Sequence, residues 1–359
     1  MSKILMKNVG SAQHILLWPE KGKNSVVVDY GIGTDYPNGA AIPQCANFPW
    51  LSDKLIFTHY HEDHYNGFIQ NISHTKPKYN FSMVYYPKMP HLLGTNSVDP
   101  QLVNILIYLI SAGISKQLVS SQYHSLYDLF NALLNNNAKA LCFIPVAEGD
   151  TIQSGGYNID ILWPRKASNG MNRRIYEVID DIYTDAQRQI PLLRKLHAFV
   201  NTTLRTATNS FQTEFVLDTN FIEQNQHALV DIQTAGLSYR QFQLLNLVTK
   251  KTTDILNKWS IAFKTNDDIL CLGDLNATQI NNICSDLINR HHQTHFDILM
   301  AAHHGTHKGF MLKKLFVANV IASVGNKLVH TKTFVNASQI YKKISKKYSN
   351  TLSQGDIQI

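Results

Sequence analysis

The 359-residue sequence predicts a single α/β domain of layered strands and helices, interrupted by two mainly helical insertions. The first observation is that short apolar runs rich in β-branched and aromatic residues occur at both ends of the chain, as is typical of buried strands. The second is that apolar residues take helical spacing from about 92 to 138, whereas Arg, Gln, Asn and Thr become frequent from about 165 to 251. We expect these two segments to be insertions that cap the domain or bind a partner protein.

The expected elements follow the chain in two series. The first series consists of strands at 3–9, 14–19, 24–31, 54–59, 80–87, 140–146 and 157–164. The second series places strands at 259–265, 268–273, 296–302, 319–325 and 355–359, and helices at 278–290, 309–317 and 337–348. No internal repeat of fixed period connects the two series, so the whole chain, 1–359, is expected to be one domain with insertions.

Composition indicates a soluble, cytoplasmic protein. The first ten residues do not resemble a signal peptide, and no segment approaches the roughly 20 apolar residues that cross a bilayer. The cysteines are far apart and lack CxxC spacing, so neither a disulfide framework nor a thiolate zinc site is expected. We predict buried thiols at Cys45, Cys142, Cys271 and Cys284.

Positive charge is concentrated near the C-terminal end. The formal net charge is +7, yet no Asp or Glu lies between Ile298 and Gly355. A basic region of this kind can attract a polyanion such as nucleic acid, although a solvated lysine face would have the same composition. The lysines of this region are Lys308, Lys313, Lys314, Lys327, Lys332, Lys342, Lys343, Lys346 and Lys347.

The stretch IFTHYHEDHYNGF, residues 56–68, places metal-ligand side chains at HxHxDH spacing. Alternate side chains of an extended segment point the same way, so His59 and His61 can hold one cation while Asp63 and His64 face a second. Imidazole and carboxylate ligands suit Zn²⁺, Mn²⁺ or Fe²⁺, and two such ions about 3.5–4 Å apart can activate a water. A histidine-rich loop arising by composition is the alternative, but the loop follows an apolar strand and precedes an Asn-Gly pair.

This run, with Gly67 after it, resembles the signature of the metallo-β-lactamase fold, an αββα sandwich of two β-sheets flanked by helices. The resemblance covers most of the chain outside the insertions. It implies that Asp29, in NSVVVDYG, orients the metal loop, and that Asp274, in ILCLGDL, bridges two metal ions. It also implies that His304, with His303 as second choice, supplies the last ligand from DILMAAHHGTHKG.

The sequence is similar in particular to the metallo-β-lactamase-like domain of the competence protein ComEC and to related phosphodiesterases. This similarity implies a metal-dependent nuclease, which agrees with the lysine-rich region. Two positions depart from the pattern: Asn257 stands where the fold usually has a histidine ligand, and Met300 where the branch commonly has a lysine. Because Asn is a poor zinc ligand, the first site would be weaker or would prefer Mn²⁺ or Mg²⁺. The matching elements are Gly273-Asp274, His303-His304-Gly305-Thr306, Ser323-Val324-Gly325 and His330.

Several of these residues have structural alternatives. Asp274 could cap the helix that follows it. Asp29 could be an ordinary turn residue. His303 could be a buried hydrogen-bonding partner of the site, and His330 could pack near it without contacting substrate.

The resulting hypothesis is a hydrolase with two divalent ions, Zn²⁺ or Mn²⁺, that cleaves phosphodiester bonds in nucleic acid with a metal-activated water. The catalytic candidates are Asp63, His303 and His330. One ion is assigned to His59, His61, Asp274 and Asn257, and the other to Asp63, His64, Asp274 and His304. The alternatives are a hydrolase of a small phosphodiester, ester, thioester or lactam, and a partner-dependent subunit of a larger complex.

Overall fold

The computed structural model describes residues 3–19, 25–36, 52–70, 80–88, 141–165 and 256–359, with a few further residues between 129 and 244. Most of the two insertions predicted at 92–138 and 165–251, together with Cys45, lies outside the described residues. In the described ranges, no helix has the length and apolar character needed to cross a bilayer. Cys271 and Cys284 are buried thiols, as predicted, whereas Cys142 is half-buried.

The first sheet has eight strands and contains both ends of the chain. Its parallel centre, β3 to β6, is flanked by antiparallel strands, and β15 from the C-terminal end pairs with β1. In order across the sheet, the strands are β15 (Ile357–Gln358), β1 (Ile4–Met6), β2 (His14–Leu17), β3 (Ser25–Tyr30), β4 (Ser52–Ile56), β5 (Met83–Pro87), β6 (Leu141–Val146) and β9 (Phe215–Leu217).

The second sheet has seven strands and is formed mainly by the C-terminal part of the chain. Strands β11 to β14 are parallel, and β10, β8 and β7 continue the sheet in antiparallel fashion. In order across the sheet, the strands are β14 (Ser345–Asn350), β13 (Phe316–Ala322), β12 (His295–Met300), β11 (Ile269–Cys271), β10 (Ala262–Thr265), β8 (Tyr157–Trp163) and β7 (Thr151–Ser154).

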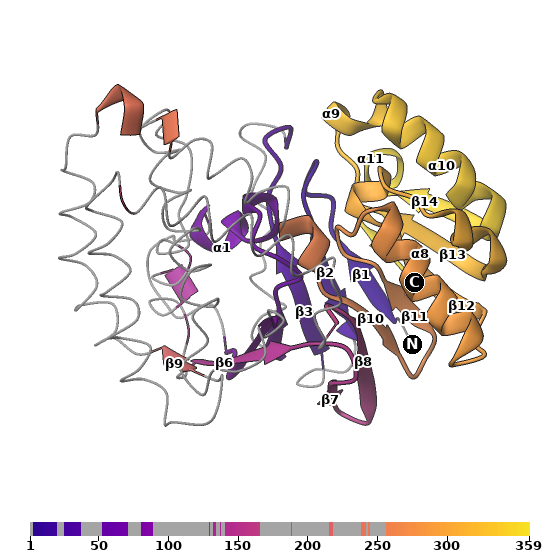
Figure 1. Ribbon diagram of the computed structural model, residues 1–359, viewed down its shortest axis with the longest axis horizontal. Helices are drawn as coiled ribbons and strands as arrows, with labels where there is room; N and C mark the ends of the chain where they lie inside the picture. Colours follow the sequence, from indigo (N-terminus) through magenta and orange to yellow (C-terminus); the bar gives the residue numbers. More distant parts are fainter. Residues whose placement is uncertain are drawn as a thin grey trace.

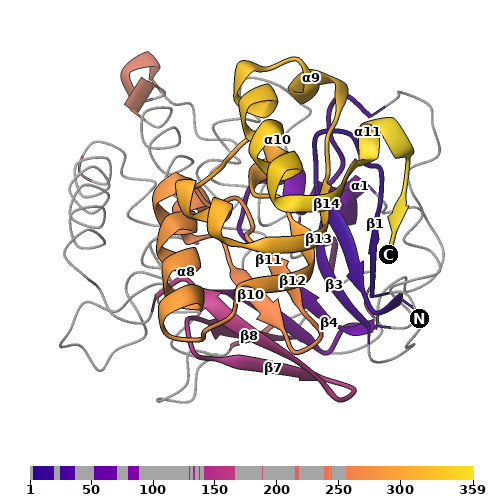
Figure 2. The same cartoon turned by 90° about the vertical axis from the view of Figure 1, so that its right-hand side faces the viewer.

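The two sheets pack face to face, with helices on their outer faces (Figures 1 and 2). Buried side chains of both sheets fill the space between them, for example Val28 and Ile56 against Ile261 and Ile298. On the outer face of the first sheet, helix α1 (Asn66–Gln70) packs its Phe68 ring edge-on against aromatic neighbours. This arrangement confirms the predicted αββα sandwich.

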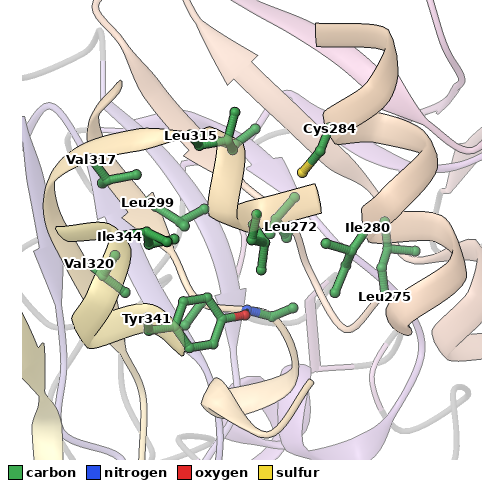
Figure 3. Packing of buried hydrophobic residues seen from close by; sticks show 14 of the residues in the cluster. Leu272, Leu275, Ile280, Cys284, Leu299, Leu315, Val317, Val320, Tyr341 and Ile344 are labelled. Carbon is green, nitrogen blue, oxygen red and sulfur yellow. The ribbon is translucent and has the colours of Figure 1, made fainter. Parts of the chain in front are cut away.

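Helices α8 (Ala277–Asn289) and α10 (Lys332–Ile344), with the 3₁₀ helix η6 (Phe310–Lys314), cover the outer face of the second sheet. Alternate strand residues and one face of each helix meet in a continuous apolar cluster, which excludes water from this layer. Figure 3 shows its members Leu272, Leu275, Ile280, Cys284, Leu299, Leu315, Val317, Val320, Tyr341 and Ile344.

Two predicted helices differ from the structure. The segment 309–317 forms only the short η6 before β13 begins at Phe316, so its last two residues are strand. The helix predicted at 337–348 instead runs from Lys332 to Ile344 and gives way to β14.

Strand β14 was missed because its exposed lysines break the apolar pattern, a feature typical of strands at the edge of a sheet. Strand β7 was also missed.

The buried hydroxyl of Tyr341 ties α10 to the loop after β12. It donates a hydrogen bond to the His307 carbonyl at 2.7 Å and accepts one from the Ala302 amide at 3.1 Å. Tyr341→Phe should therefore lower the free energy of unfolding by about 1–3 kcal/mol, because both backbone groups lose their partner. Urea unfolding followed by circular dichroism measures this change.

Tyr348→Phe is the matched control, because the Tyr348 hydroxyl is buried without a hydrogen-bond partner among the described residues. Its loss should leave the free energy of unfolding nearly unchanged. Equal destabilisation by the two variants would contradict the anchoring role of Tyr341.

Candidate metal centre

The predicted ligands come together where strands of both sheets end. His59, His61, Asp63 and His64 follow β4, and the last two of these lie in the 3₁₀ helix η3 (Glu62–His64). Asp274 follows β11, and the loop with His303 and His304 follows β12. The Ile261 amide donates to the Thr58 carbonyl at 2.7 Å and joins the two sheets beside this cluster.

Asp274 lies at the centre of the cluster and is buried. Its Oδ2 is 3.3 Å from His64 Nε2, 3.6 Å from His59 Nε2, 3.7 Å from His303 Nε2 and 3.8 Å from His304 Nε2. Its other oxygen, Oδ1, is buried without a hydrogen-bond partner in the described part of the chain. A buried carboxylate surrounded by imidazole nitrogens fits a divalent cation, because N and O ligands of this kind are the ones that transition-metal ions take.

Two overlapping groups of side chains have the spacing of metal ligands. His59, His64 and Asp274 form one, and Asp63, His64 and His304 form the other, with the ligand atoms of each group within 4.8 Å of one another. His64 therefore belongs to both groups, whereas the sequence assigned it to one. His61 Nδ1 lies 3.0 Å from His59 Nε2, at the edge of the first group.

Asp29 lies behind the cluster and holds His64 in place. Its Oδ2 is 2.7 Å from His64 Nδ1, which leaves Nε2 of the same ring facing Asp274. The Thr58 amide donates to Asp29 Oδ1 at 2.8 Å, and the Thr58 hydroxyl donates to Oδ2 at 2.5 Å. Asp29 thus lies where a residue that orients the metal loop would lie, because a carboxylate on the far nitrogen of an imidazole fixes its tautomer and direction.

Two hydroxyl residues of the site were missed by sequence reasoning. Thr58 contacts Asp29, and its Oγ1 is also 3.2 Å from His59 Nδ1. Ser260 accepts a hydrogen bond from the Asp274 amide at 2.9 Å and lies 3.5 Å from His59 Nδ1. A single Thr or Ser beside a motif carries no periodic or spacing signal, so the sequence offered no way to distinguish them from other hydroxyl residues.

The backbone of the site takes conformations that are costly for ordinary residues. His303 and His304 have φ values of 49° and 55°, in the left-handed region that favours glycine. Gly31 lies so close to the metal loop that an added Cβ would lie 1.5 Å from the Asp63 carbonyl oxygen. The packing of surrounding loops therefore sets where these side chains point.

Three other predicted residues lie at the border of the cluster or outside it. His303 faces Asp274 with Nε2, while its Nδ1 lies 3.1 Å from His307 Nδ1. Asn257 begins the 3₁₀ helix η4 (Asn257–Trp259), and its buried Oδ1 has no hydrogen-bond partner among the described residues. His330 is exposed at the end of α9 (Asn326–Val329). The substrate role of His330 stays a prediction.

The cluster is closed on one side and open on the other. The side chains of His64, His59 and Asp274 have 0%, 1% and 1% of their surface exposed, whereas those of His303 and Asp63 have 31% and 38%. The partly exposed side of the cluster is thus formed by Asp63 and His303, while Asp29 and Thr58 lie on the buried side.

Burial and mutual attraction set the charges of the metal-free cluster. Burial alone would raise the pKa of Asp274, but His64 and the other histidines hold it well below the usual value. Burial alone would lower the pKa of His64, but Asp274 and Asp29 raise it well above 6.5. Burial is likewise outweighed at His304, whose pKa is raised by Asp274 and Asp63. Burial and the charge of His64 hold the pKa of His59 well below 6.5.

Metal binding is therefore expected to release protons near neutral pH. The metal-free cluster favours the protonated forms of His64 and His304, whose pKa values are raised, whereas a metal ion binds only the neutral imidazole nitrogen. Metal affinity should rise as the pH rises toward the raised pKa values of these two residues. Calorimetric titration at pH 7 in buffers of different ionisation enthalpy should give binding heats that change with the buffer, because the released protons are taken up by it. Heats that are independent of the buffer would contradict these assignments.

The comparisons with known proteins add little to this geometry. No protein-family model matches the chain, and no curated protein matches it. Among solved structures, the chain is similar to the metallo-beta-lactamase fold protein YhfI from Bacillus subtilis, with 8% sequence identity and a TM-score of 0.40 over 99% of each chain.

Proposed function

We propose that the protein is a metal-dependent hydrolase that cleaves phosphodiester bonds in nucleic acid. The observation that carries the proposal is the pair of ligand groups that share His64, one of which contains Asp274, with Asp63 and His303 partly exposed beside them. Two bound divalent ions, Zn²⁺ or Mn²⁺, would make a water nucleophilic near neutral pH and stabilise the attacking and leaving oxygens.

The side chains of the cluster have separate tasks in this scheme. His59, His64, Asp274, Asp63 and His304 would hold the ions through the atoms that face one another. Asp63 is the carboxylate on the open side, so it can also accept the proton of the attacking water. Burial would raise the pKa of Asp63, but His64 and His304 hold it below the usual value, so the group carries the negative charge that a cation ligand needs.

A nucleic-acid substrate is supported by the charge of the C-terminal region. All nine of its lysines are exposed, and none of them forms an ion pair in the described part of the chain. Their charge is therefore available to a polyanion, whose phosphates attract lysines and arginines regardless of base sequence.

Cleavage of labelled single- and double-stranded DNA and RNA by the purified protein tests the proposal. Each reaction is run with Mn²⁺, Mg²⁺ or Zn²⁺, beside an Asp63→Ala control. Cleavage that needs both a metal ion and Asp63 is expected. A metal-loaded protein that leaves all four substrates intact, but hydrolyses a small phosphodiester or another small ester, would contradict the nucleic-acid substrate.

A further inference from the structure

Six lysines and the exposed Phe316 lie at the end of the second sheet away from the metal centre, and the exposed Phe310 begins η6, the 3₁₀ helix that contains Lys313 and Lys314. Lys313 and Lys314 immediately precede β13, and the other four lysines lie at the end of α10 and the start of β14. The register pairs Val317 with Ser345, so these two segments are neighbours in space. We call this group the lysine–phenylalanine patch; its members are Phe310, Phe316, Lys313, Lys314, Lys342, Lys343, Lys346 and Lys347.

The two phenylalanines are unusual for a water-exposed surface. Phe310 and Phe316 are 69% and 63% exposed, the second and third highest values among the exposed large apolar residues described. The His295 ring stacks on Phe316, with centroids 5.1 Å apart and planes 18° apart. An exposed aromatic ring among lysines fits a nucleic acid with unpaired bases, since bases stack on such rings and lysines neutralise the phosphates.

Two further lysines lie along helix α10, between the patch and the metal centre. Helix α10 begins beside that centre, where its Phe334 ring and Ala322 at the end of β13 both line Gly305, the residue after His304. The helix is 13 residues long, roughly 20 Å, and its last residues lie at the patch. Lys332 lies at its start, and Lys308 is held beside its middle by a hydrogen bond from Nζ to the Asn336 carbonyl at 3.0 Å.

We infer that the lysine–phenylalanine patch is a binding site for single-stranded nucleic acid, which anchors a strand that runs along α10 to the metal centre. The choice of ligand class rests on the proposed function. Double-stranded DNA fits less well, because its stacked bases are not available to Phe310 and Phe316. We therefore expect the protein to prefer single strands that are long enough to reach from the patch to the metal centre, roughly 20 Å away.

Binding is measured by fluorescence anisotropy with a labelled oligothymidylate of about 20 nucleotides, in EDTA so that no cleavage occurs. Phe316→Leu should weaken binding by about fivefold to 140-fold, whereas Phe316→Trp should retain it. The double variant Lys346→Gln/Lys347→Gln should reduce the slope of log affinity against log salt by about 1.4. Wild type and Phe316→Leu should hydrolyse a small chromogenic phosphodiester at equal rates.

The matched control is Lys3→Gln/Lys54→Gln, which removes the same formal charge from lysines already paired with Asp297 and Asp53. This control should bind like wild type. Equal weakening by the two lysine pairs, no effect of Phe316→Leu, or binding to phosphatidylserine vesicles but not to the oligonucleotide would overturn the inference. Patch-dependent binding by a protein that cleaves nothing would support the site and contradict the hydrolase instead.

Discussion

Asp274→Asn is expected to abolish metal-dependent cleavage while leaving the fold intact. Asp274 Oδ2 lies within 3.8 Å of four histidine nitrogens, and Oδ1 is buried without a hydrogen-bond partner among the described residues. Asparagine keeps the volume of the side chain and the Asp274 backbone bond to Ser260, but it removes the negative charge that would hold the cations. The loss of turnover should exceed the roughly 10–100-fold that follows removal of a residue behind a ligand.

Asp268→Asn is the control for this experiment. Asp268 and Asp274 stand at opposite ends of β11, and Asp268 lies at the end remote from the metal centre, where its Oδ1 accepts a bond from Gln293. Rates are measured with the best metal and oligonucleotide, and circular dichroism checks the fold. Turnover by Asp274→Asn at the rate of Asp268→Asn would contradict the central place of Asp274.

Asp29→Asn is expected to weaken both the fold and metal binding. The carboxylate is fully buried, faces His64 Nδ1 at 2.7 Å and accepts two hydrogen bonds from Thr58. Removing one partner of a buried ion pair costs about 3–5 kcal/mol of unfolding free energy. Because His64 also loses the group that directs its ring, metal affinity should fall about 10–100-fold.

Asp35→Asn separates these two effects. Asp35 is another loop carboxylate that accepts several bonds, from the Ser11 amide and hydroxyl and from the Lys327 amide, but it touches none of the described ligand candidates. This variant should lose stability and keep wild-type metal affinity. Stability is read from urea unfolding, and affinity from calorimetric titration. Unchanged metal affinity in Asp29→Asn would show that His64 needs no orienting partner.

Local sequence patterns predicted the layers of the fold because strand periodicity and buried helical faces are short-range signals. The strands before the metal loop and before Asp274 were found from apolar runs that end in turn residues. The edge strand β14 was not predicted from such a run. It pairs with a neighbouring strand on one side only, and its Lys346 and Lys347 are exposed to solvent. Its existence depends on pairing with β13, which no local pattern records.

Sequence reasoning predicted which residues come together at the site more closely than it predicted how they divide into two ligand groups. Spacing along an extended chain suggested that His59 and His61 would share one cation and that His64 would face another. The 3₁₀ turn at Glu62–His64 instead returns His64 toward His59 and Asp274, so His64 joins both groups. Thr58 was missed because its role appears only when Asp29, distant in sequence, folds against it.

The number of divalent ions bound per chain tests the central claim most directly. Wild-type protein and Asp274→Asn are stripped of metal with a chelator, loaded with Mn²⁺ or Zn²⁺, and separated from free metal. The bound metal per chain is then measured by elemental mass spectrometry. The two ligand groups predict two ions for wild type and at most one for Asp274→Asn. A wild-type chain that holds no ion, or an Asp274→Asn chain that still holds two, would contradict the account.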